Sequence, residues 1–311
     1  MNVPPHHRDI RGYSVHSEAD NVLLNAQLYL PRPVFFENQE EAPTVVFLHS
    51  WLLTSNMWVD IMQHLLSQGF QCLTIDRRGY GLSQWSTGQR PTIMNMNVFS
   101  QDLVSVLKRL DLHRYVIVGS GIGCNESLTA ITRYPELFHD CRGLVWIAPL
   151  LPFPEQSPMS PGTPPRDVWE AMRRGISRWN PQRTQYTWNI FCEMAQQEGQ
   201  IENTDEVVNC QSHLMRAIPD AISDSLPAFL DERGYNDQLM LINDDPQFRH
   251  MRIVLAHGAN DRGNPESATT ARIARRLQRS QRVVFQDAGP NIHRTKALEI
   301  SRLIWTAMFG P

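Results

Sequence analysis

A glycine-rich turn at residues 119–123 lies between an apolar run and a helical pattern, in the stretch YVIVGSGIGCN (115–125). Turns of the form G-x-S-x-G between a strand and a helix raise the middle side chain above a sheet, where a serine hydroxyl can attack a carbonyl. Gly119 and Gly123 match the flanks of this pattern, but the middle residue is Gly121. Because glycine has no side-chain atom, position 121 cannot form a covalent intermediate.

Two neighbours of Gly121 could replace the missing nucleophile. Ser120 would do so if the turn were shifted by one residue, but adjacent side chains at such a turn point in different directions. We therefore expect Ser120 to be a hydrogen-bonding wall of a pocket, with a serine hydrolase that attacks through Ser120 as an alternative. Cys124 lies one turn into the following helix, where a cysteine is usually a small buried hydrophobe.

An aspartate and a histidine follow the last two strand-like runs. Asp261 lies in GANDRGNP (258–265), just past a strand, and Pro265 is expected to open the next helix. His293 lies in DAGPNIHRTKALEI (287–300), at the start of the C-terminal helical pattern. Turn aspartates are common before helices, but an aspartate and then a histidine in this order can orient an imidazole as a general base. We predict that His293 is this base and that Asp261 orients it.

These residues need a sheet that brings the ends of several strands together. Short β-rich runs alternate with helical patterns, which is typical of a mostly parallel sheet flanked by helices. The first two runs alternate in polarity and predict an antiparallel pair, and the continuous apolar run at 44–50 predicts a strand buried on both faces. The predicted strands are 11–17, 25–31, 44–50, 71–76, 115–120, 143–149, 251–258 and 282–289, with helical patterns at 56–69, 99–112 and 122–135.

The alternation of strands and helices stops between residue 150 and about residue 246. This segment opens with a proline-rich passage, PLLPFPEQSPMSPGTPP, and continues with helical stretches that carry three tryptophans, Trp169, Trp179 and Trp188. We predict an α/β core made of 1–149 and 247–311, with 150–246 inserted as a helical cap over one edge of the sheet. Ligands of open α/β sheets bind at the carboxyl ends of the strands, where the residues singled out above all fall.

In order along the chain, five segments resemble those of the α/β-hydrolase-fold superfamily, over roughly 40–135 and 247–310. They are FLHSWLLTSNMW (47–58), similar to the oxyanion strand and loop, DRRGYGLS (76–83), similar to D-x-R-G-x-G-x-S, GSGIG (119–123), GANDRGNP (258–265) and the late His293. The resemblance implies the α/β-hydrolase fold, a mostly parallel central sheet flanked by helices with an inserted helical cap.

The resemblance also implies roles for single residues. Asp261 matches the acid, His293 the base and Gly121 the nucleophile position. The backbone N–H groups of Trp51 and Ile122 match the two donors of an oxyanion hole.

The sequence departs from the family's pattern at two further places. His49-Ser50-Trp51 replaces the usual His-Gly-x, so His49 and Ser50 become possible pocket residues and an indole is expected beside the oxyanion site. In the segment GPNI (289–292), three residues separate the glycine from His293, whereas in the usual pattern glycine comes directly before the histidine.

A base, an orienting acid and an oxyanion hole suit the removal of a proton from an O–H, N–H or C–H group. Some members of the superfamily are similar: cofactor-independent dioxygenases acting on quinolones also have a tryptophan after the oxyanion strand, as Trp51 is here, and hydroxynitrile lyases and cyclases use the same scaffold. We predict an enzyme without a serine nucleophile, with the chemistry of a cofactor-free oxygenase, lyase, isomerase or cyclase, or direct activation of water. The expected substrate is a small, flat, apolar molecule with one ionisable group.

The alternative from another class is a non-catalytic ligand-binding or scaffold protein related to hydrolases. Loss of function would not preferentially spare Asp261 and His293, and this favours an enzyme.

The overall charge, the apolar segments and the cysteines bear on which partners, location and cofactors the protein is expected to have. The net charge of −3 gives no reason to expect nucleic acid. The N-terminus lacks the apolar core of a signal peptide, and no apolar run approaches the ~18 residues of a membrane span, so we expect a cytoplasmic protein. The five cysteines contain no CxxC pair, and position 124 is not the glycine that G-x-G-x-x-G would need; neither a metal nor a dinucleotide cofactor is expected.

Overall fold

The computed structural model describes residues 6–32, 42–88, 94–151, 165–197, 216–230 and 235–310. Most of the proline-rich passage, residues 152–164, lies outside these ranges, as do parts of the predicted cap. No helix in the described ranges is long and apolar enough to cross a membrane.

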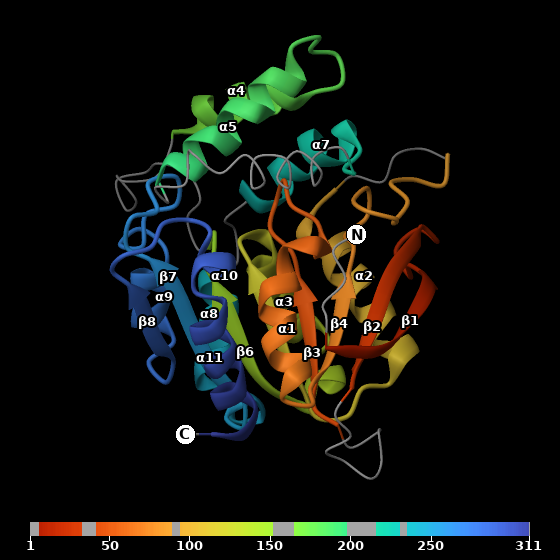
Figure 1. Cartoon of the computed structure of the whole chain (residues 1–311), viewed down its shortest axis with the longest axis vertical. Helices are drawn as coiled ribbons and strands as arrows, with labels where there is room; N and C mark the ends of the chain where they lie inside the picture. The colour runs from red at the N-terminus through yellow and green to blue at the C-terminus, as the bar shows by residue number, and fades with distance from the viewer. Residues whose placement is uncertain are drawn as a thin grey trace.

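The centre of the described chain is an eight-stranded sheet (Figure 1). Its order is β1-β2-β4-β3-β5-β6-β7-β8. β1 pairs antiparallel with β2 and β2 antiparallel with β4, whereas the remaining pairs are parallel. This confirms the predicted sheet and its N-terminal antiparallel pair. The strands are β1 (His7–His16), β2 (Leu23–Pro31), β3 (Thr44–Leu48), β4 (Gln71–Ile75), β5 (Tyr115–Ser120), β6 (Cys141–Ile147), β7 (Arg252–Gly258) and β8 (Gln281–Phe285).

Burial along the strands follows from helices on both faces of the sheet. Every residue of β3, β4 and β5 is buried, as apolar runs without alternation predict. On one face, α1 (Val59–Ser67) and α11 (Ala297–Phe309) pack together, with the short α10 (Ile292–Thr295) beside α1. The other layer is α2 (Met96–Leu110), α3 (Ile122–Arg133), α8 (Tyr235–Asp244) and α9 (Thr270–Arg276), each helix contacting the next. Short 3-10 helices are η2 (Ser55–Trp58), η3 (Pro135–Phe138) and η4 (Pro246–Phe248).

One predicted helix start was wrong. The helix after Asp261 begins at Thr270 in α9 and not at Pro265. The carbonyl of Pro265 instead accepts hydrogen bonds from the Ala268 N–H (3.0 Å) and the Thr269 hydroxyl (3.2 Å), and these close a turn ahead of the helix.

Three helices from the inserted segment lie together beyond one end of the sheet (Figure 1): α4 (Arg166–Ile176), α5 (Arg183–Gln197) and α7 (Pro219–Leu230). They are joined to the loops that follow β3 and β4. The indole Nε1 of Trp51 donates to the Ile222 carbonyl (3.0 Å), and Tyr80 forms a β-bridge with Ala217. α8 instead packs against α3 and α9, beside the sheet. The division into a core and a cap over 150–246 stays a prediction.

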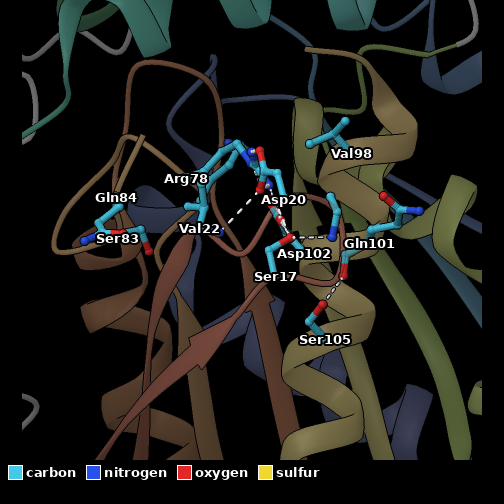
Figure 2. Close-up of polar contacts among 12 residues, drawn as sticks. Ser17, Asp20, Val22, Arg78, Ser83, Gln84, Val98, Gln101, Asp102 and Ser105 are labelled. Carbon is cyan, nitrogen blue, oxygen red and sulfur yellow. Dashed lines mark hydrogen bonds and ion pairs between the residues drawn. The ribbon is translucent and has the colours of Figure 1, made fainter. Parts of the chain in front are cut away.

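A buried arginine fastens the N-terminal hairpin to the loop after β4 and to α2 (Figure 2). Arg78 has no exposed surface, and its guanidinium donates to Asp102 (2.6 Å), Asp20 (2.7 Å) and Ser17 (3.2 Å). Burial raises the pKa of the Asp102 carboxyl, and the contact with Arg78 opposes that rise. We call Ser17, Asp20, Arg78 and Asp102 the Arg78 cluster.

Candidate active site

The turn between β5 and α3 has a backbone conformation that L-amino acids rarely adopt. Gly121 has φ 53° and ψ −116°, and its N–H donates to the Ile147 carbonyl at the end of β6 (3.1 Å). Gly123 is also required, because a Cβ there would collide with the carbonyl oxygen of Leu48. The glycines therefore permit both the sharp turn and the close approach of α3 to β3.

Ser50 lies beside Gly121, as the strand register dictates. Leu48 of β3 pairs with Gly119 of β5, so residues 50 and 121 both come two positions further along these parallel neighbours. A Cβ on Gly121 would lie 2.5 Å from the Oγ of Ser50. Ser50 is half-buried, and its hydroxyl has no hydrogen-bond partner among the described residues.

The two predicted oxyanion donors follow β3 and β5. Ile122 is the first residue of α3, so its N–H has no acceptor within the helix. Trp51 lies in the turn after β3, and its indole contacts helices of the inserted segment; the expectation that it also lies beside the oxyanion site stays a prediction. The indole packs edge-on against Trp169 of α4, with ring centroids 6.4 Å apart, and bonds to Ile222 of α7. The indole of Trp51 therefore holds two helices of the inserted segment.

His49 was predicted as a possible pocket residue, and the structure buries it completely. Its Nε2 accepts from the Arg77 backbone N–H (3.0 Å), so we assign the proton to Nδ1, which then donates to the Ser50 carbonyl (2.9 Å). Both ring nitrogens of His49 are thus hydrogen-bonded to backbone groups, and these bonds hold the backbone at Ser50 in place.

Arg77 and Glu126, which were not among the predicted site residues, form a buried ion pair. Their Nη2 and Oε2 atoms are 2.9 Å apart, and Arg77 also donates to the His49 carbonyl (2.7 Å). Burial raises the pKa of the Glu126 carboxyl, and Arg77 opposes that rise. The pair ties α3 to the loops after β3 and β4. Glu126 is the one charged residue of α3 before Arg133, and this was the sequence signal for the pair.

The carboxylate of Asp261 is buried and held within its own loop. It accepts from the Asn264 backbone N–H (2.9 Å), and its Oδ2 is 3.7 Å from Nε2 of the fully buried His257. The Asn264 side chain donates to the carbonyls of Ala148 and Pro149, which fixes this loop to the end of β6. Asn264, three residues after Asp261, is another supporting residue that was not among the predicted site residues.

His293 lies on α10, after β8, and is only 8% exposed. Its ring meets the Trp58 ring edge-on, with centroids 6.4 Å apart. The structure thus places the predicted acid and base after neighbouring parallel strands. The contacts described for Asp261 lie on its own loop and on β7, so its pairing with His293 stays a prediction.

Ser120 and Cys124 flank the turn in different environments. Ser120 ends β5 and is 6% exposed, and its hydroxyl has no hydrogen-bond partner in the described ranges. Cys124 is fully buried, and its Sγ donates to the Gly119 carbonyl (3.3 Å). Burial raises the pKa of the Cys124 thiol far above its ordinary value, which disfavours the reactive thiolate. Nowhere in the described ranges do three His, Cys, Asp or Glu side chains gather as metal ligands.

A mostly parallel sheet with a strained strand–turn–helix after β5, and with an acid and a histidine after β7 and β8, defines a protein of the α/β-hydrolase class. The chain belongs to the alpha/beta hydrolase fold family, whose model matches residues 43–297.

The similar curated proteins are enzymes. A putative non-heme chloroperoxidase of Synechocystis sp. is 24% identical over 87% of this chain and 93% of that protein. A non-heme chloroperoxidase of Kitasatospora aureofaciens is 23% identical over 83% of this chain and 89% of that protein. A bifunctional esterase/perhydrolase of Acinetobacter calcoaceticus is 28% identical over 44% of this chain and 47% of that protein.

Solved structures share the fold. A bromoperoxidase from Bacillus anthracis superimposes with a TM-score of 0.79 at 17% identity, covering 95% of this chain and 98% of that one. An esterase from Exiguobacterium antarcticum gives a TM-score of 0.79 at 18% identity with the same coverage. These likenesses confirm the predicted α/β-hydrolase fold.

Proposed function

We propose that this chain is an α/β-hydrolase-fold enzyme that acts on a small organic molecule by general-base catalysis, without a nucleophile at the elbow. His293 is the base and Asp261 orients it. The observation that carries the proposal is Gly121, which has the strained backbone of an elbow residue but no side chain with which to attack.

The proposed reaction begins when the imidazole of His293 accepts a proton from an O–H, N–H or activated C–H group of the substrate. The negative charge that forms is held by the backbone N–H groups of Trp51 and Ile122. One such donor is commonly worth about 3–4 kcal/mol to the transition state, and a positioned base contributes about 10²–10⁴-fold in rate. The anion can then react as in a cofactor-free oxygenase, lyase, isomerase or cyclase. Alternatively, His293 removes a proton from a water molecule, which then attacks the substrate directly.

A second candidate is ester hydrolysis or the related chemistry of the named chloroperoxidases and esterases, with Ser120 as nucleophile. The hydroxyl of Ser120, without a described partner, favours it. The position of Ser120 as the buried last residue of β5, rather than at the tip of the turn, weighs against it. A non-catalytic ligand-binding relative is the third candidate, and it predicts binding without proton transfer.

The test uses a panel of phenols, hydroxyquinolines and 1,3-diketones whose anions absorb at wavelengths distinct from the neutral forms. With the wild-type protein, at least one compound should show its anion spectrum below its solution pKa, and the His293→Ala variant should not produce it. If the His293→Ala variant gave the same anion spectrum, this would contradict the proposal that His293 is the general base. A compound that binds but stays neutral would favour the ligand-binding candidate.

A further inference from the structure

We propose that Ser50 supplies the side-chain hydroxyl at the tip of the elbow, in place of the residue at position 121, and that it donates a hydrogen bond to the reacting group of the substrate. This inference rests on the proposed function, because it names a further substrate-contacting residue of the same site.

The first support is the space that the Ser50 hydroxyl occupies. A Cβ on Gly121 would lie 2.5 Å from the Ser50 Oγ, which is closer than real Cβ atoms approach an oxygen. The next side-chain atom, outside Ser50, is Leu150 Cδ1 at 3.8 Å. The Ser50 hydroxyl therefore lies directly beside the position where the side chain of an elbow residue would begin.

The second support is the contrast between the backbone and the side chain of Ser50. Its backbone N–H donates a hydrogen bond to the Met57 sulfur (3.4 Å). Its carbonyl accepts hydrogen bonds from His49 Nδ1 (2.9 Å) and from the Leu53 N–H (3.3 Å). The hydroxyl, in contrast, has no hydrogen-bond partner among the described residues and is half-buried. A fixed backbone thus presents a hydroxyl that can donate to a substrate atom.

The third support is the pair of departures found in the sequence. Where the family's pattern has glycine after the histidine, this chain has Ser50, and where the pattern has serine at the elbow, this chain has Gly121. The two positions together hold one hydroxyl. The exchange keeps a hydroxyl at the site but moves it to the chain segment that follows β3.

The role that follows is a hydrogen bond and not a covalent one. The proton taken by His293 comes from the substrate, and the Ser50 O–H donates to the oxygen or nitrogen that becomes negative. The substrate class is therefore one whose reacting centre carries such an atom, as in a phenolate, an enolate or an amide anion.

The shared space is tested with a fluorophosphonate probe and intact mass on Gly121→Ser and on the double variant Ser50→Gly/Gly121→Ser. The double variant should be labelled at position 121 about tenfold faster or more, because the single variant crowds two hydroxyl side chains into one space. Equal labelling rates in the two variants, or a folded double variant that is not labelled, would overturn the claim that the side chains of residues 50 and 121 share one space.

Thermal unfolding keeps this test valid if Gly121→Ser folds poorly. Adding Ser50→Gly to Gly121→Ser should raise the melting temperature by a few degrees, since it removes the contact at Oγ. The same Ser50→Gly change in the wild type should not raise it. A melting temperature of Gly121→Ser that does not rise with Ser50→Gly would contradict the shared space.

The contact with substrate is tested on the compound whose anion the wild type stabilises. Ser50→Ala should raise the apparent pKa of that bound compound by about 1–2 units, the loss expected for one hydrogen bond to a charged group. An unchanged pKa would overturn the contact, as would a fluorophosphonate adduct at position 50 in the wild type.

Failure of the proposed base has a different signature. Adding His293→Ala to the double variant should abolish labelling at position 121 if His293 is the base. Labelling that persists there would contradict the role of His293 while leaving the exchange between positions 50 and 121 intact.

Discussion

The Arg78 cluster and the elbow differ in how their polar groups are satisfied. In the cluster, the guanidinium of Arg78 bonds to two carboxylates and a hydroxyl, with no exposed surface (Figure 2). At the elbow, the hydroxyls of Ser50 and Ser120 have no hydrogen-bond partner in the described ranges. Since buried polar groups are normally paired, the cluster reads as structure, whereas the elbow hydroxyls, which are not among the buried unpaired atoms, remain available to a ligand.

The adjacent arginines Arg77 and Arg78 differ in the segments that they hold together. Arg78 bonds to the hairpin and α2, whereas Arg77 bonds to His49 and Glu126 and so positions the backbone around Ser50. Since both ion pairs are buried, both are expected to stabilise the fold, and the Arg77 contacts in addition fix the chain around Ser50.

The largest expected effect breaks the cluster. Asp102→Ala should lower the free energy of unfolding by about 3–5 kcal/mol, because it leaves much of the buried Arg78 charge uncompensated. Glu18→Gln is the matched control, since the Glu18–Lys108 pair is about half exposed and should cost less than about 1 kcal/mol. Urea unfolding measures both. If the two variants lost equal free energies of unfolding, the Arg78 cluster would contribute no more to stability than an exposed ion pair.

The next effect removes the proposed base. His293→Ala should reduce substrate turnover, or anion formation in the compound panel, by about 10²-fold or more. The variant should stay folded, and circular dichroism checks this. Wild-type anion formation in a folded variant would contradict the role of His293.

A smaller effect separates backbone strain from crowding at the elbow. Gly121→Ala should cost about 1–3 kcal/mol of stability, since it places a side chain at positive φ and against Ser50 Oγ. Gly88→Ala is the control, because Gly88 also has positive φ (80°) but no atom of the described residues within 4 Å of a new Cβ. If Gly88→Ala costs as much as Gly121→Ala in chemical denaturation, crowding by Ser50 contributes nothing.

The smallest effect concerns the shifted nucleophile. Ser120→Ala should change stability by no more than about 0.5–1 kcal/mol and leave most activity, because its hydroxyl makes no described hydrogen bond and acts only as a wall. Complete loss of activity in this variant would revive the serine hydrolase that uses Ser120.

The sequence predicted the sheet well because buried parallel strands are continuous apolar runs. β5 was placed at its true bounds, and the other strands and the α1 to α3 helices differ from expectation by a few residues at their ends. The start of α9 was missed because the turn at Pro265 depends on a side-chain hydrogen bond.

Much less of the site was predictable. The glycines at 119–123, Asp261 and His293 were visible as motifs, but the Arg77–Glu126 pair and the approach of Ser50 to Gly121 join segments far apart in sequence. The direction of the Trp51 indole depends on α4 and α7, whose packing no local pattern records.

The most direct test of a site without a nucleophilic serine is exposure of the purified wild-type protein to a fluorophosphonate serine-hydrolase probe, followed by intact mass and peptide mapping. We predict no adduct in a protein that circular dichroism shows to be folded, because position 121 has no hydroxyl and Ser50 only donates a hydrogen bond. A stoichiometric adduct mapped to Ser120 would contradict this account and show a covalent hydrolase with a shifted elbow.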